Sequence, residues 1–183
     1  MEAPTSPTDV WLSFAGQIDN HLCGRLFQQL AIAVQNRVAH LHLLIQSAGG
    51  FVGDGVAIHN VLLNLPIQVT TYNAGAVESI ALLPYLAGKI RRVSKNATFM
   101  LHKTSCPPLP IGAPAKVLRA KADDSDLHDK NVEETLRGVL KLPDAKWAIH
   151  AERDLLISAT EAVEYGLAHE VADFKPGFPF IHV

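Results

Sequence analysis

Cysteine is scarce in this sequence. Only two of the 183 residues are cysteines, Cys23 and Cys106, and they lie far apart without the close spacing of zinc-binding pairs. The sequence therefore predicts neither a disulfide framework nor a cysteine-based metal site. We expect no metal ion and no cofactor.

Long hydrophobic runs and an N-terminal targeting signal are also absent. The longest apolar stretches, at residues 61–65 and 80–86, fall well short of the roughly 18 residues that span a bilayer. Residues 1–9 lack both the basic and the apolar part of a secretory signal, so they are predicted to form a flexible lead-in. We expect a cytoplasmic protein with no membrane partner.

The chain has no strong excess of charge of one sign. There are 16 Lys and Arg residues against 18 Asp and Glu residues, and the net charge is -2. This balance argues against a nucleic-acid partner. A chain of this length with 48% hydrophobic and 19% charged residues is typical of one globular domain. We place that domain at residues 10–174 and assign residues 175–183 to a C-terminal tail.

Strand-like and helix-like segments alternate through the first half of the chain. This alternation favours an α/β fold of repeated βαβ units with a mostly parallel sheet. The Asn-Ala-Gly sequence at residues 73–75 is expected to end the third strand. The predicted strands lie at residues 10–14, 40–45, 67–72, 90–93 and 98–102, and the predicted helices lie at residues 20–35, 52–65 and 79–86.

The second half of the chain contains a predicted loop and a long polar helix. Residues 103–114 include four prolines, which exclude regular structure. Residues 115–140 favour a charged helix with only a partial apolar face, so we expect it to pack lightly or against a neighbouring subunit. Pro143 can open a further helix, and Ser158 with Glu161 predicts a capping box at the start of another.

A serine lies where a strand is predicted to give way to a helix. Residues 75–81 (GAVESIA) place Ser79 at the carboxyl edge of the sheet. The N–H groups of a first helical turn have no partners within the helix, so they can stabilise an oxyanion beside a serine nucleophile. A serine near a helix start is more often a cap, and the segment lacks the Gly-x-Ser-x-Gly pattern of the α/β-hydrolases.

A second turn of this kind follows the preceding strand. Residues 47–50 (SAGG) contain paired glycines, which let the backbone approach a ligand closely. The Gly50 N–H is therefore a candidate oxyanion donor. An ordinary connection between a strand and a helix is the alternative interpretation.

A serine nucleophile needs a base, and the sequence has nine histidines. His102 ends the apolar run at residues 97–101, at the end of a predicted strand. Asp154 precedes another apolar run and is expected to be partly buried beside a polar partner. Composition and periodicity do not choose between Asp154, Asp144 and Asp173 as a third catalytic residue.

Four segments of the chain resemble the proteolytic subunit of the Clp protease, a family of the Clp/crotonase fold. The resemblance extends from about Val10 to Val171. Residues 44–50 (LIQSAGG) are similar to the family's strand ending in Asn-Ser-Pro-Gly-Gly, with alanine in place of proline. The other three segments are residues 75–81, similar to its Gly-x-Ala-Ala-Ser-Met-Gly turn; residues 99–102 (FMLH), similar to its Met-Ile-His; and residues 152–167, which contain its Glu-Arg-Asp and Glu-Ala-Val-Glu-Tyr-Gly-Leu.

The resemblance implies a function and a role for each site residue. Ser79 would be the nucleophile, His102 the base, and Asp154 the residue that orients the base, while the N–H groups of Gly50 and Ile80 would form the oxyanion hole. The implied activity is that of a serine endopeptidase, which cleaves short or unfolded polypeptides through an acyl-enzyme. The implied assembly is a homo-oligomeric ring enclosing a chamber, with stacked heptamers as one arrangement.

The sequence also departs from the family pattern. Val77 and Glu78 replace small residues before the serine, and prolines interrupt the segment after His102. In the family an additional N-terminal segment helps to dock an ATP-driven unfoldase, and the short stretch before Val10 argues against that partner. Residues 103–140 are still expected to form the handle region through which the family's rings contact each other.

Two other functions are compatible with these observations. One is a crotonase-like acyl-CoA enzyme, in which the two oxyanion N–H groups bind a thioester without a serine nucleophile. The presence of Ser79, His102 and Asp154 and the short chain count against it. The other is a non-catalytic paralogue of the Clp protease, which the altered serine turn favours.

Overall fold

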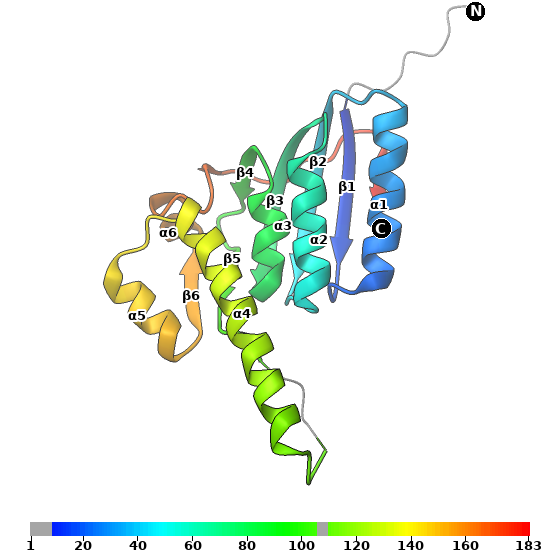
Figure 1. The fold of residues 1–183 in the computed structure, drawn as a ribbon. Helices are drawn as coiled ribbons and strands as arrows, with labels where there is room; N and C mark the ends of the chain where they lie inside the picture. The colour runs from blue at the N-terminus through cyan, green and yellow to red at the C-terminus, as the bar shows by residue number, and fades with distance from the viewer. Residues whose placement is uncertain (1–8, 106–109) are drawn as a thin grey trace, which may run out of the picture.

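The computed structural model describes residues 9–105 and 110–183. They form an eight-stranded sheet in which β6, β5, β3, β2, β1 and β8 are neighbours in that order, while β4 pairs with β3 and β7. Figure 1 shows α1, α2 and α3 side by side along the sheet and α4 extending away from it. The elements are β1 (Asp9–Ala15), α1 (Asn20–Gln35), β2 (His40–Ser47), α2 (Val52–Leu63), β3 (Gln68–Glu78), the 3₁₀ turn η1 (Ser79–Ala81), α3 (Leu82–Leu86), β4 (Ile90–Val93), β5 (Thr98–Leu101), α4 (Ala115–Val139), α5 (Asp144–Glu152), β6 (Leu155–Ser158), α6 (Ala159–Glu164), β7 (Glu170–Val171) and β8 (Phe180–His182).

The predicted α/β fold with a mostly parallel sheet is confirmed. Strands β1, β2 and β3 run parallel, and among the strands of the described residues only the β5–β6 pair is antiparallel. Alternate residues of β2 such as Leu41 and Leu43 are fully buried, as are Leu22 and Leu26 of α1. Burial of these apolar side chains between sheet and helices fixes the strand order, which brings the carboxyl ends of β1, β2 and β3 to one edge.

The expected end of the third strand at residues 73–75 was wrong. Strand β3 continues to Glu78. Side-chain hydrogen bonds to the backbone support it where it stops pairing with β4 and begins to pair with β5. The Asn73 amide donates to the Thr98 carbonyl (2.8 Å), and the Gln46 side-chain oxygen accepts from the Ala76 N–H (2.9 Å). The strand pairs with β4 before this point and with β5 after it, so β3 delivers Ser79 beside the end of β5.

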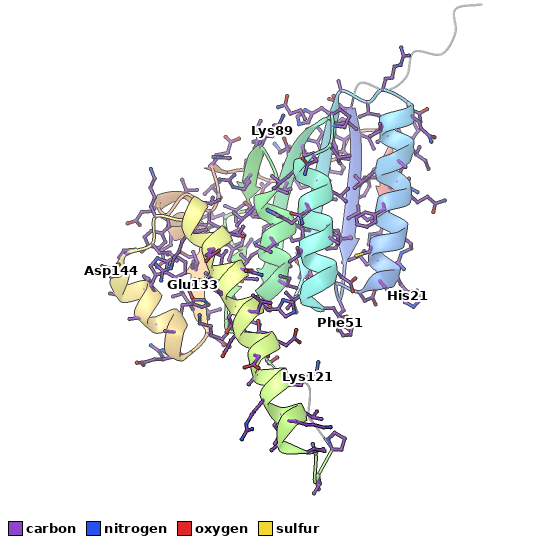
Figure 2. The ribbon with its side chains drawn as sticks, viewed as in Figure 1. His21, Phe51, Lys89, Lys121, Glu133 and Asp144 are labelled. Carbon is purple, nitrogen blue, oxygen red and sulfur yellow. The ribbon has the colours of Figure 1, made fainter. Side chains whose placement is uncertain are left out.

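Helix α4 packs lightly on the rest of the molecule, as its sequence predicts. Leu136 is its only buried residue. Polar contacts help to attach the helix: the Lys103 ammonium lies 2.6 Å from the Glu133 carboxylate, and the Asp129 carboxylate accepts from the Thr104 N–H at 2.6 Å. Figure 2 shows Glu133 on the half of α4 near the sheet and Lys121 on the projecting half.

The proline-rich segment is irregular where it is described. Residues 103–105 and 110–114 form neither helix nor strand, whereas Cys106 and the three residues after it lie outside the described residues. Within the described ranges, no helix is both long and apolar enough to cross a membrane.

The C-terminal tail at residues 175–183 contributes a strand of its own. Strand β8 pairs in parallel with β1, and the register places Trp11 beside Phe180. The Ser13 hydroxyl and His182 Nδ1 are 3.0 Å apart, which adds a side-chain contact to the pairing. The tail therefore covers the outer edge of β1.

The predicted capping box at the start of α6 is present. The Ser158 hydroxyl accepts from the Glu161 N–H (3.3 Å), and the Glu161 carboxylate accepts from the Ser158 N–H (3.0 Å). The same carboxylate pairs with Lys146 of α5 at 2.8 Å. These contacts hold α5, β6 and α6 together, and they lower the pKa of Glu161 to about 2, with the Lys146 ammonium as the largest cause.

We predict that Ser158→Ala lowers the free energy of unfolding by about 1 kcal/mol, because an N-cap side chain is lost. Urea denaturation at fixed protein concentration measures the change. Thr160→Ala is the matched control, since Thr160 is an exposed residue of the same helix outside the capping box. Its effect should stay within about 0.5 kcal/mol. Equal losses in both variants would contradict the assignment of the cap.

Candidate active site

Ser79 occupies a turn between β3 and α3 and has an unusual backbone conformation. Its φ angle is 56°, in the left-handed region that residues other than glycine seldom adopt. Such a conformation costs on the order of 1–3 kcal/mol and persists only where the surroundings impose it. The turn lies at the carboxyl edge of the parallel strands and leaves Ser79 half-buried.

The structure brings Ser79 and His102 into contact. Ser79 Oγ lies 2.6 Å from His102 Nε2, a hydrogen-bond distance. The contact follows from strand pairing: Glu78 of β3 lies beside Met100 of β5, so the residues that follow the two strand ends are neighbours. This is the relation that a serine nucleophile and its base require.

Neither glycine of the β2–α2 turn leaves room for a side chain. A Cβ on Gly49 would lie 2.6 Å from the Cβ of Ser79, and the Gly49 φ angle is +99°. A Cβ on Gly50 would collide with the backbone of Ile18. At Gly49 the backbone of this turn therefore lies directly against the serine.

A cavity of about 80 Å³ lies beside the serine. Ser79, His102 and both predicted oxyanion donors, Gly50 and Ile80, line it. Helix α4 closes one side. The remaining lining is mostly apolar and consists of Val52, Leu82, Leu101, Val132 and Leu136, together with the polar residues Thr104, Ser105 and Asp129. The cavity can hold a small group next to the Ser79 oxygen.

Asp154 lies at the same end of the sheet as His102 but does not contact it. Leu101 of β5 pairs with Leu155 of β6, so His102 and Asp154 occupy adjacent positions just past this antiparallel ladder. The Asp154 side chain is exposed, and no hydrogen bond joins it to His102 within residues 9–105 and 110–183. The expectation of a partly buried carboxylate was wrong, because the residue precedes β6 and faces solvent.

Two further polar side chains near the site were not identified from the sequence. Asp129 lines the cavity from α4, but nothing in its helical context distinguishes it from the other acidic residues there. His150 of α5 is buried, and its Nδ1 has no hydrogen-bond partner within the described residues. Burial lowers the pKa of His150, so its ring is neutral near pH 7. Its place in an amphipathic helix predicts burial but no role.

Comparison with known proteins assigns the chain to a family. The model of the Clp protease family matches residues 8–175. Among solved structures, a mutant of ClpP1 from Listeria monocytogenes is similar, with a TM-score of 0.77 and 21% sequence identity. The match covers 90% of this chain and 92% of that chain, and at this identity it shows a shared fold. The family match over nearly the whole chain shows more: this protein is a member of the Clp protease family.

Proposed function

We propose that the protein is a serine endopeptidase whose nucleophile is Ser79 and whose general base is His102. The observation that carries the proposal is the 2.6 Å contact between Ser79 Oγ and His102 Nε2 in a chain of the Clp protease family. The left-handed backbone of Ser79 supports it, because strained residues cluster at functional sites. Peptide bonds of short or unfolded polypeptides are the proposed substrates.

The reaction proceeds through an acyl-enzyme. His102 takes the hydroxyl proton as Ser79 Oγ attacks the peptide carbonyl, and the N–H groups of Gly50 and Ile80 stabilise the resulting oxyanion. The tetrahedral intermediate collapses, the C–N bond breaks, and His102 gives its proton to the leaving amine. A water molecule then attacks the ester, again with His102 as base, and releases Ser79.

Asp154 is the proposed residue that orients His102. Its backbone already lies beside that of the histidine at the end of the β5–β6 ladder. Its exposed carboxylate reaches the imidazole only if its side chain turns toward it. In this structure Ser79 and His102 are therefore in contact, whereas Asp154 is adjacent to His102 without a hydrogen bond to it.

The handle region is the proposed contact between rings. Helix α4 projects from the sheet with one buried residue and with exposed apolar residues that include Val117, Leu118 and Leu127. Apolar side chains on a projecting helix gain free energy when a partner covers them. A second copy of the chain is the partner that the family suggests, in a cytoplasmic ring that encloses the active sites.

We predict that a fluorophosphonate probe labels the protein at Ser79. Labelling should be lost in Ser79→Ala and should fall by a factor on the order of 10⁴ or more in His102→Ala, because loss of a triad member removes the activated nucleophile. In-gel fluorescence and mass spectrometry of the labelled peptide measure the rate and the site. His59→Ala is a control, since His59 does not line the cavity beside the serine and its Nδ1 lies 2.6 Å from the Leu83 carbonyl.

The outcomes separate the competing functions. A folded oligomer that takes up no label would overturn the peptidase proposal and favour a non-catalytic paralogue or an acyl-CoA enzyme. In the same assay Asp154→Asn tests the third residue: strongly reduced labelling supports its role in orienting His102, and labelling at the wild-type rate excludes that role.

Gly49→Ala should also abolish labelling, because its Cβ would displace Ser79 from His102 and its φ angle disfavours alanine. Gly53→Ala is the matched control. A Cβ at Gly53, in helix α2 a few residues away, meets no atom within 4 Å, so this variant should label like the wild type. Circular dichroism monitors folding in both. If Gly49→Ala were labelled at the wild-type rate, the proposed close packing of the β2–α2 turn against Ser79 would be wrong.

The proposed ring predicts a particle several times larger than the 19.8 kDa chain. Multi-angle light scattering measures its mass. Replacing exposed Leu118 and Leu127 of α4 by Ser should reduce that mass, since the proposed ring-to-ring contact loses apolar area. A wild-type protein that stays monomeric at high concentration would exclude the chamber, and unchanged assembly of the double variant would exclude α4 as the contact.

A further inference from the structure

A cluster of two histidines and one aspartate lies at the opposite end of the strands from Ser79. His40 and His42 belong to β2, and Asp9 is the first residue of β1. Alternate residues of a strand face the same side of the sheet, and the register places Asp9 beside His40. All three residues therefore lie on one face of the sheet near the amino ends of β1 and β2.

The three side chains converge. One ligand atom from each lies within 4.8 Å of the other two. His42 Nε2 is 4.0 Å from a carboxylate oxygen of Asp9, and the two imidazole centroids are 4.0 Å apart. The side chain of His42 is only 11% exposed, whereas that of Asp9 is 41% exposed. The cluster is therefore buried at His42 and accessible to solvent at Asp9.

Neighbouring side chains fix both imidazoles. The Tyr72 hydroxyl lies 2.8 Å from His42 Nδ1, and the Thr70 hydroxyl lies 2.8 Å from His40 Nε2. Trp11 stacks on His42 with an interplanar angle of 5°. Among the described residues, each histidine thus has one nitrogen within hydrogen-bond distance of a hydroxyl and one nitrogen without a hydrogen bond. Metal-binding histidines are likewise held through the nitrogen that does not bind the metal.

We propose that Asp9, His40 and His42 form a binding site for a divalent transition-metal ion such as Zn²⁺. The ligand atoms would be His42 Nε2, His40 Nδ1 and a carboxylate oxygen, with water in a fourth position. Zn–N bonds of 2.0–2.1 Å place tetrahedral ligands roughly 3.3 Å apart. The 4.0 Å separation of His42 Nε2 from the Asp9 carboxylate must therefore close by less than about 1 Å, and no pair of ligand atoms by more than about 1.5 Å. Rotation of the exposed Asp9 side chain can bring its carboxylate closer, and small rotations of the imidazoles must supply the rest.

The surrounding charges are compatible with a cation. Arg92 donates to the Tyr72 hydroxyl, but its guanidinium is paired with Glu170 at 2.6 Å. Burial, followed by the neighbouring His40, lowers the pKa of His42 to about 4, and burial also lowers the pKa of His40. Both rings are therefore neutral near pH 7, the form that binds metal. The sequence-based expectation of no metal considered cysteine spacing and overlooked this histidine pair.

Calorimetric titration of metal-free full-length protein with Zn²⁺ tests the proposal. One ion should bind per chain, and Asp9→Asn and His40→Gln should each weaken binding about tenfold or more. His21→Gln is the matched control, since this exposed histidine lies at the start of α1, near the opposite end of the strands (Figure 2). Ser79→Ala and His102→Ala should bind like the wild type, which separates this site from the proposed active site.

A second measurement is independent of affinity. Co²⁺ in the site should give the intense visible absorption of tetrahedral coordination, which Asp9→Asn should diminish while circular dichroism stays unchanged. His42 is not substituted, because its burial against Trp11 makes it part of the packing. Absence of saturable binding, or equal affinity in the wild type, Asp9→Asn and His40→Gln, would overturn the proposal.

Discussion

The active-site geometry depends on the close approach of two backbone turns. The turn after β2 meets the turn after β3 at a distance that admits no side chain at Gly49, and Gly50 meets Ile18 in the same way. Ser79 adopts its left-handed backbone at this contact, and its hydroxyl lies beside His102. The buried strands beneath supply the rigidity that maintains such strain.

Most of the fold could be predicted from hydrophobic periodicity and local signals. The strand at residues 90–93 and the capping box at Ser158 were predicted as they occur, because each depends on residues close together in sequence. The full length of β3 could not be predicted, because Asn73 and Ala76 are held by Thr98 and Gln46 from other strands. Local sequence shows a break there, and tertiary hydrogen bonds override it.

The candidate site was predictable in part. From the residues alone, several histidines remained candidates for the base and several aspartates for the third catalytic residue. The family resemblance selected Ser79, His102 and Asp154. The contact between serine and histidine depends on pairing of β3 with β5, and the exposure of Asp154 depends on where β6 begins. The histidine pair of β2 is visible as His-x-His, but its relation to Asp9 requires the register of β1 against β2.

The pairing of β8 with β1 has a consequence for the order of folding. The contact between Ser13 and His182 joins segments 169 residues apart in the chain. During synthesis, β1 leaves the ribosome long before β8, so its outer hydrogen-bonding groups have no strand to meet in the interim. An unpaired edge is a template for pairing between chains. Nascent copies are thus most exposed to aggregation through β1, and closure of this edge is a late event with a high contact order.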